Sequence, residues 1–388
     1  MGFSFPNEIT ATTVIMSVMA VFVLVGTVDR LLGNRFGYGE EFEKGVKTVG
    51  PLMLVMAATY AVAPALAKVL LPVVGPIYRL FGADASMCAG TILAIDMGGY
   101  PLAMEMTENA ALGSFSGMII GSTMGAMMVG TIPLAISYLK PGDKRIFAYG
   151  ILIGILTIPL GCIAGGLSMG LGIGVILQNL LPLLVLDGLI AAGLIFLQSF
   201  TVRLFTAVGT GISMLIAVLF GLAAVQYMTG IRFPFVGDML TLEEGTGISR
   251  LDRGLAICGQ IGLILAGAFP MFAWLSKRLK RPIAWLGGKM GVNDAAVVGL
   301  LANQANALAM LNLFDRMDER GKLLNIAAAV SLSYVLGDHL AFVAGVDAGM
   351  VVPVLLTKLT AGVSAIILAW VLAPKIVKPA LPVITDCN

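Results

Sequence analysis

The chain has 388 residues, of which 58% are hydrophobic and only 12% are charged, and its formal net charge is +2. Soluble domains carry about a quarter charged residues, so a soluble enzyme, a nucleic-acid-binding protein and a secreted disulfide scaffold are largely excluded. One histidine and four scattered cysteines, Cys88, Cys162, Cys258 and Cys387, leave little basis for a metal site. The composition predicts an all-α polytopic membrane protein.

Long apolar segments follow one another along the whole chain, and most reach the roughly 20 residues that a helix needs to cross a bilayer. Helices are expected because lipid offers no hydrogen-bond partner to backbone amides. The segments are predicted at 9–28, 46–67, 85–107, 114–139, 146–168, 171–198, 205–228, 254–275, 292–314, 322–346 and 349–373.

Two of these segments are interrupted. The segment 85–107 contains a helix-breaking run from Asp96 to Pro101 in its middle, and 292–314 carries several side-chain amides inside an apolar frame. Interrupted segments at corresponding positions in the two halves of a transporter mark its binding site. These two segments are therefore predicted to form the site together.

A shift of 209 residues relates the two halves of the chain without a gap. It pairs Gly45 with Gly254 and Gly82 with Gly291, among other identities, and it places the two interrupted segments on each other. We therefore expect two structural repeats, at 1–170 and 201–388, which are joined by a linking helix at 171–200.

The distribution of basic residues indicates how the segments cross the membrane. If 85–107 and 292–314 re-enter without crossing and the amino terminus lies outside, the inner face holds 18 basic residues and the outer face 5. If both segments cross, the count is nearly balanced, so the positive-inside rule favours the re-entrant arrangement. The repeats are then inverted, with nine crossing helices and two paired broken or re-entrant helices.

Several motifs spread over nearly the whole chain carry a resemblance to a known family. They are VDR at 28–30, DMGG at 96–99, TIPLGCIAGGL at 157–167, GAFPM at 267–271, LLANQANALAM at 300–310, MDERGK at 317–322 and LGDHLAF at 336–342. The chain resembles the EutH family, the ethanolamine permeases of bacterial ethanolamine-utilisation operons. The resemblance implies uptake of ethanolamine across the cytoplasmic membrane by facilitated diffusion.

Ethanolamine is a small primary ammonium ion with one hydroxyl group, so its site needs a carboxylate or carbonyl oxygens at one end and an amide or hydroxyl at the other. Asp96 is the first candidate, because an ionisable group at membrane depth is costly and points to function. Gly98 and Gly99 would permit close approach of the substrate, and Tyr100 would supply an aromatic face. The structural alternatives are that Asp96 caps a half-helix and that Tyr100 only packs.

Other candidates lie in and beside the two broken segments. Glu105 either attracts cations or belongs to a solvated face. Asn303, Gln304 and Asn306 either receive the substrate hydroxyl or form a hydrogen-bonded clamp between helices.

Two further groups of ionisable residues lie within spans. His339 is the only histidine and follows Asp338, so the pair could bind substrate or relay a proton, or it could be a satisfied polar contact. Successive helical residues point about 100° apart, so one of the two is expected to face the pathway. Asp187 and Lys358 are expected to form a buried ion pair, which would lower the cost of both charges.

The resemblance thus implies an ethanolamine permease, and the paired broken segments favour alternating access as its mechanism. The alternative is a proton- or cation-coupled transporter of a related small amine or amino alcohol. An intramembrane enzyme is disfavoured by the single histidine, and a structural or sensor protein is disfavoured by the broken repeats. The expected partners are ethanolamine and the lipid bilayer, with no nucleic acid, cofactor or metal, and a homodimer stays open.

Overall fold

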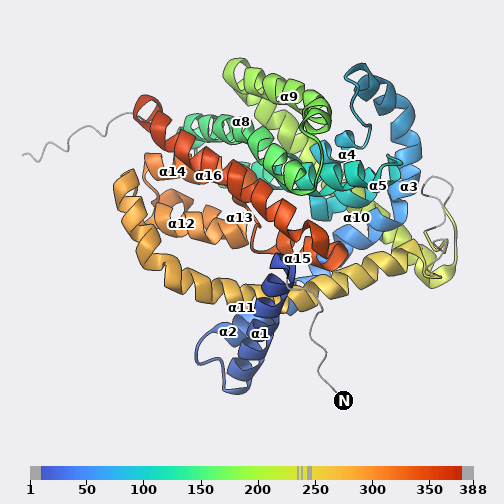
Figure 1. Ribbon diagram of the computed structural model, residues 1–388, viewed down its shortest axis with the longest axis horizontal. Coiled ribbons are helices and arrows are strands. Elements are labelled where there is room, and N and C mark those ends of the chain that lie inside the picture. The colour runs from blue at the N-terminus through green and yellow to red at the C-terminus, as the bar shows by residue number, and fades with distance from the viewer. Residues whose placement is uncertain (1–9, 234–235, 237–238, 243–246, 378–388) are drawn as a thin grey trace, which may run out of the picture.

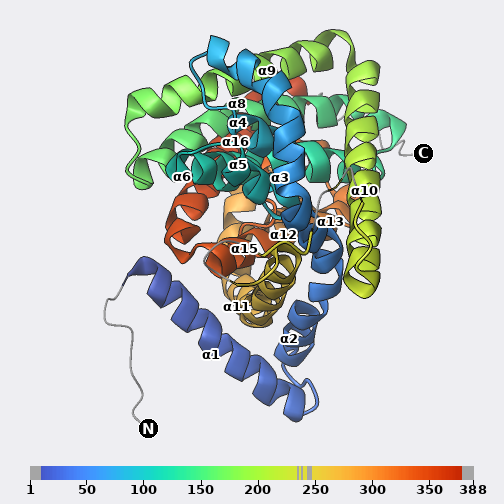
Figure 2. The same ribbon diagram turned by 90° about the vertical axis from the view of Figure 1, so that its right-hand side faces the viewer.

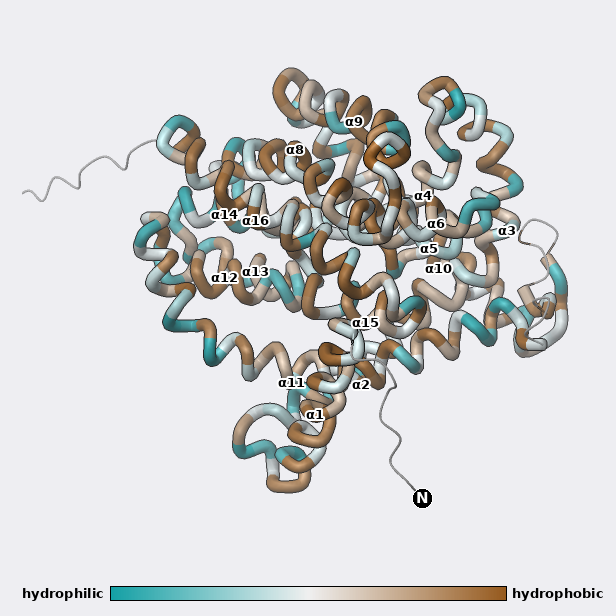
Figure 3. Tube along the Cα trace, viewed as in Figure 1, coloured by the Kyte–Doolittle hydropathy of each residue, from teal (hydrophilic) through white to brown (hydrophobic). Residues whose placement is uncertain are grey.

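The computed structural model describes residues 10–233, 236, 239–242 and 247–377, and these are almost entirely helical (Figure 1). Eight helices in this part of the chain are long and apolar enough to cross a membrane. Apolar residues run along most of them, whereas the two ends of the longest helix are hydrophilic (Figure 3). The predicted all-α polytopic membrane fold is confirmed. Cys387 lies outside the described residues.

The first half of the chain contains three long apolar stretches, a broken element and a region of mixed α- and π-helix. In chain order its elements are α1 (Ala11–Leu31), α2 (Tyr38–Lys47), α3 (Val49–Leu80), α4 (Met87–Ile92), η1 (Ile95–Gly99), α5 (Tyr100–Glu105), α6 (Ala110–Ser114), η2 (Phe115–Gly125), η3 (Met127–Thr131), α7 (Ile132–Ile136), η4 (Pro141–Asp143) and α8 (Lys144–Ser168).

The second half follows a single apolar helix, α9 (Ile173–Phe196), which lies in the region expected to link the repeats. Its elements are α10 (Gln198–Thr229), α11 (Arg250–Met290), α12 (Asp294–Ala305), α13 (Ala307–Leu311), η5 (Phe314–Arg316), α14 (Glu319–Leu332), α15 (Asp338–Val346), η6 (Ala348–Met350) and α16 (Val351–Ile376).

The expected span 322–346 is not one continuous helix. It divides into α14 and α15, which are separated by the non-helical residues 333–337. Tyr334 has φ +65°, and the amides of Tyr334 and Leu336 donate to the carbonyls of Asn303 and Gln304 rather than within a helix. Because these amides bond to the polar end of α12, they do not continue the helix, and the span is broken here.

The first broken segment folds back on itself. Residues 93–94 are extended between α4 and η1, and α5 then returns the chain towards the start of the segment. The Thr107 hydroxyl donates a 2.8 Å hydrogen bond to the carboxylate of Asp84, so the two ends of the segment meet. The segment is a hairpin.

The second broken segment closes in the same manner. Asn306, in an extended conformation, separates α12 from α13. The Asn293 side chain donates to the carbonyl of Arg316 at 2.8 Å, and the Asn293 amide donates to Asp318 at 3.0 Å. The two ends of this segment also meet.

Equivalent positions under the 209-residue shift have matching structure. Gly82 and Gly291 follow the ends of α3 and α11 with φ +64° and +68°. Asp84 and Thr107 correspond to Asn293 and Arg316, the residues that close the second hairpin. The apolar stretches Tyr38–Leu80 and Arg250–Met290 have 43 and 41 residues.

Helices α8 and α16, which the 209-residue shift places on each other, run antiparallel where they pack. A Cβ on Gly161 in α8 would lie 2.4 Å from the Thr357 carbonyl oxygen in α16, and one on Gly165 would lie 3.1 Å from that of Pro353. Contacts nearer the C-terminus of α8 are thus made by residues nearer the N-terminus of α16. Such close approach of backbones requires small residues, which are typical of helix packing in membranes.

The outer helices surround the hairpins and the α8–α16 pair. Helix α11 runs along one edge of the bundle, and α1 and α2 project beyond it (Figure 1). After a turn of 90°, α10 is seen along one side, with α9 across the top (Figure 2). The turn into α2 is held by Asp29, which is 2% exposed and accepts hydrogen bonds from the amides of Phe36, Tyr38 and Gly39.

Candidate functional site

Three ionisable side chains from three different elements form a line inside the bundle. His339 Nε2 lies 3.9 Å from Asp96 Oδ1, and His339 Nδ1 lies 3.1 Å from Lys358 Nζ. The lysine is 1% exposed and the histidine 2%, whereas the Asp96 side chain keeps 18% of its surface accessible. We call Asp96, His339 and Lys358 the charged line.

Asp96 reaches this position because the chain is not helical around it. Gly98 has φ +96°, in the left-handed region that favours glycine, and a Cβ there would lie 2.7 Å from the Cβ of Thr59 on α3. A Cβ on Gly99 would lie 2.6 Å from the carbonyl oxygen of Leu93. The two glycines therefore let the η1 turn pack closely while it carries the carboxylate into the bundle.

His339 lies in the first turn of α15, directly after the break in the span. The Tyr334 ring from that break lies 5.3 Å from the imidazole ring, with 33° between their planes. The break itself is held by α12, because the amide of Tyr334 donates to the Asn303 carbonyl at 3.2 Å. The second broken segment therefore positions the histidine through the break before α15.

Lys358 comes from the middle of α16 and crosses to the first half of the chain. Its ammonium donates to the carbonyl oxygen of Ser122 in η2 at 2.6 Å and to His339 Nδ1. When Lys358 is protonated it can only donate, so Nδ1 is then the acceptor and the imidazole proton is assigned to Nε2, which faces Asp96. The line is thus ordered as ammonium, imidazole and carboxylate.

The expected ion pair between Asp187 and Lys358 is wrong. Lys358 has Ser122 and His339 as its partners, and neither carboxylate oxygen of Asp187 has a hydrogen-bond partner among the described residues. Asp187 is 5% exposed in α9, a helix that packs on α8 and α10. The sequence shows two opposite charges within spans but does not show which helices face each other.

The side-chain amides of the second broken segment have different surroundings. Asn303 is fully buried, its oxygen accepts a 2.7 Å hydrogen bond from Ser333, and its amide nitrogen has no partner in the described part of the chain. Asn306 caps α13 by accepting from the Leu308 amide at 2.7 Å. Gln304 contributes its backbone carbonyl to the break before α15.

The remaining predicted site residues lie around the charged line or farther away. Tyr100 packs edge-on against Phe342 of α15, with ring centroids 6.1 Å apart. Asp338 is half-buried beside His339 at the start of α15. Glu105 forms an ion pair with Arg250 at the start of α11, and both side chains are about one third exposed. The structure thus brings Asp96 and His339 together and places Glu105 in a separate contact.

Two more ion pairs join loops of the two halves. Lys322 contacts Asp143 at 2.6 Å, with 13% and 9% of the side chains exposed, and Lys140 contacts Asp315 at 2.9 Å, with 65% and 53% exposed. The hydrogen bond that the Lys140 ammonium donates to the Asp315 carboxylate raises the pKa of this lysine. These pairs connect the loop before α8 to the segment around η5 and α14.

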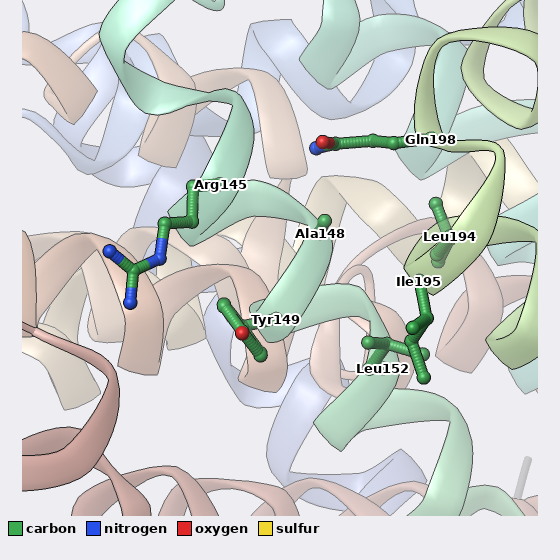
Figure 4. A pocket seen from close by; sticks show the side chains of 7 residues that line it. All are labelled: Arg145, Ala148, Tyr149, Leu152, Leu194, Ile195 and Gln198. Atoms are coloured by element: carbon green, nitrogen blue, oxygen red, sulfur yellow. The ribbon is translucent and has the colours of Figure 1, made fainter.

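A surface pocket between α8 and the α9–α10 corner is lined by Arg145, Ala148, Tyr149, Leu152, Leu194, Ile195 and Gln198 (Figure 4). Its walls contain none of the residues that the sequence singled out. This pocket therefore lies apart from the charged line.

Comparison with known proteins covers almost the whole chain. The family model "Ethanolamine utilisation protein, EutH" matches residues 11–372. The chain is 40% identical to the "Probable ethanolamine permease EutH" of Listeria monocytogenes over 365 residues, which are 94% of this chain and 95% of the relative. It is 37% identical to proteins of the same name from Salmonella typhimurium and Escherichia coli, over 93% of this chain and 95% of each relative. No solved structure matches it. The chain belongs to the EutH family.

Proposed function

We propose that this protein is a permease that takes up ethanolamine across the cytoplasmic membrane and leaves it chemically unchanged. The observation that carries the proposal is Asp96, an acid at a helix break inside the bundle, partly accessible and 3.9 Å from an imidazole. Ionisable groups at membrane depth are costly and belong by default to a substrate or ion pathway. Three relatives with 37–40% identity carry the name probable ethanolamine permease.

The chemistry of the site suits a primary ammonium ion with a hydroxyl. The Asp96 carboxylate would accept charge-assisted hydrogen bonds from the ammonium, each of which contributes about 1.5–3 kcal/mol. The unpartnered amide nitrogen of Asn303 would donate to the hydroxyl oxygen. A buried amide hydrogen without an acceptor is costly, so the substrate would satisfy it.

The transport cycle that we propose is alternating access between two inverted repeats. Equivalent helices pack antiparallel, and the two hairpins close at equivalent positions. The first hairpin carries Asp96 of the charged line, and the second holds the break before His339 through the carbonyls of Asn303 and Gln304. Folds of this kind bind substrate where their broken helices meet and expose the site to each side in turn. A cation carried inward gains about 2.3 kcal/mol per 100 mV of membrane potential, so facilitated diffusion suffices for uptake.

A coupled transporter is the second candidate, and the position of His339 favours it. The imidazole lies between a carboxylate and an ammonium, where it could pass a proton along the charged line. Proteoliposomes loaded with a pH dye distinguish the two mechanisms. A proton flux that begins only when ethanolamine is added indicates coupling, and uptake without such a flux indicates facilitated diffusion.

The central test is uptake of labelled ethanolamine into proteoliposomes by the wild type, Asp96→Asn and Asp187→Asn. Both substitutions neutralise an acid inside a span, but only Asp96 belongs to the charged line. We expect saturable uptake by the wild type, at least about a tenfold loss of apparent affinity in Asp96→Asn and little change in Asp187→Asn. Normal uptake by Asp96→Asn would remove this aspartate from the site, and no saturable uptake by the wild type would refute the permease.

A further inference from the structure

Lys358 is a buried primary ammonium to which no carboxylate of the described residues is hydrogen-bonded. Its hydrogen-bond partners are a backbone carbonyl and an imidazole, and it is 1% exposed. The acids that face this region from neighbouring elements are Asp96 on η1 and Asp338 on α15, and Tyr334 lies over the imidazole. The charge of Lys358 is therefore balanced through His339 rather than by contact.

A carrier that binds a cation through a carboxylate meets a difficulty when it returns empty. With substrate bound, the carboxylate and the ammonium neutralise each other. Without substrate, an unpaired negative charge would have to pass through the closed state of the carrier, and removing one partner of a buried charge pair is strongly unfavourable. Such a carrier would exchange substrates readily and would return empty only slowly.

We infer that Lys358 is a tethered ammonium that balances Asp96 in the empty carrier and so permits its return. The inference rests on the proposed function. In the loaded carrier the substrate ammonium replaces Lys358 as the counter-ion of Asp96, and Lys358 keeps its hydrogen bond to the Ser122 carbonyl. No proton moves in this exchange of partners, so the loaded site carries one positive charge more than the empty site, and the Ser122 carbonyl and the His339 imidazole are the acceptors that stabilise Lys358 there.

The geometry supports one ammonium group at each end of the charged line. Lys358 lies at the inaccessible end, whereas Asp96 keeps 18% of its side chain exposed. The 3.9 Å separation between Asp96 and His339 Nε2 is too long for a hydrogen bond, so the carboxylate retains acceptor capacity for a substrate. Lysine and ethanolamine present the same group, a primary ammonium on a methylene.

The first test uses the wild type in proteoliposomes and needs no variant. Net efflux of labelled ethanolamine into substrate-free buffer requires the empty carrier to return, whereas exchange into buffer with unlabelled ethanolamine does not. We expect the two rates to be of the same order. Exchange without measurable net efflux would overturn the inference, because the empty carrier would then not return despite Lys358.

The second test compares Lys358→Met with Lys358→Arg, which keeps the charge. We expect the ratio of net efflux to exchange to fall by at least about 30-fold in Lys358→Met relative to the wild type. Lys358→Arg should keep both activities. Equal loss of net efflux and exchange in a monodisperse Lys358→Met protein would overturn the inference, as would unchanged net efflux.

Lys358→Met could also fail to fold, because it leaves Asp96 unbalanced. The double variant Asp96→Asn/Lys358→Met removes both charges and should then be recovered as a monodisperse protein. If the single variant fails and the double variant fails equally, the pairing is refuted. Absence of both exchange and net efflux in the wild type would instead refute the permease itself.

Discussion

The hydroxyl of Thr107 donates a 2.8 Å hydrogen bond to the carboxylate of Asp84 and thereby joins the two ends of a 22-residue intervening segment. The carboxylate also accepts from the Ser86 amide at 2.9 Å, so it fixes the start of the segment as well as its end. A segment whose ends are joined in this way enters and leaves on the same face of the bundle. The corresponding hydrogen bond from Asn293 to the Arg316 carbonyl joins the ends of the second broken segment in the same way.

The two hairpins are predicted to open towards opposite sides of the membrane. Single cysteines at Ala85 and Glu108 should react with an impermeant maleimide from outside, and cysteines at Asp294 and Glu319 from the cytoplasm. The reason is that the repeats are expected to be inverted and the positive-inside rule places the second hairpin's ends inside. The measurement is labelling of intact cells compared with inside-out vesicles.

These labelling experiments use a background in which the native cysteines are replaced. Cys88, Cys162 and Cys258 are buried, so their replacement does not change the surface that the maleimide reaches. Labelling of Ala85→Cys and Glu108→Cys from opposite sides would show that the first segment crosses the membrane. Labelling of all four positions from one side would refute inversion but would leave both hairpins intact.

The sequence predicted the positions of both broken segments because polar and helix-breaking residues are conspicuous in an apolar frame. It did not predict the break before His339, where the residues 333–337 contain only one glycine and no proline. That break depends on backbone hydrogen bonds to the carbonyls of Asn303 and Gln304, which are distant in sequence. Local pattern carries no signal for such a contact.

Gly98→Ala is predicted to destabilise the protein and to impair uptake. A Cβ at φ +96° costs about 1–2 kcal/mol, and here it would also lie 2.7 Å from the Cβ of Thr59. Gly188→Ala in α9 is the matched control, because nothing lies within 4 Å of its added Cβ. The midpoint of thermal unfolding in detergent and the rate of uptake are measured together. Equal midpoints for the two variants would show that the η1 turn adapts to a side chain.

Asp143→Asn is predicted to destabilise the protein more than Asp315→Asn. The Asp143–Lys322 pair is about nine-tenths buried, and removing one partner of a buried pair costs about 3–5 kcal/mol. The Asp315–Lys140 pair is more than half exposed, and water screens such pairs so that they contribute little to stability. Unfolding midpoints in low and high salt measure both effects. The reverse order would show that the buried pair is not a significant link between the halves.

Asp96 and His339 were both found from the sequence as ionisable groups within spans, and the structure places them in one line with Lys358. The partner of Lys358 was not found. A lysine side chain reaches several ångströms from its helix, so the choice between Asp187 and His339 depends on helix packing that no local pattern determines. The contact with Ser122 could not be predicted from its side chain, because Ser122 contributes only its backbone carbonyl.

Asn303→Ala is predicted to reduce discrimination between ethanolamine and ethylamine. The Asn303 amide nitrogen has no partner among the described residues and would donate to the substrate hydroxyl, which ethylamine lacks. Loss of one hydrogen bond to a neutral group contributes about 0.5–1.5 kcal/mol, so the ratio of apparent affinities should fall by up to about tenfold. Competition by each amine against labelled ethanolamine uptake measures the ratio.

Ser333→Ala is the matched control for this substitution. It removes the hydrogen bond that Asn303 accepts at 2.7 Å but keeps the amide nitrogen, so it should lower stability without changing the ratio. A ratio that falls equally in both variants would indicate a structural effect on the break before α15. An unchanged ratio in Asn303→Ala would move the hydroxyl contact to another residue and would leave Asp96 as the ammonium site, because the two ends of the substrate are tested by separate substitutions.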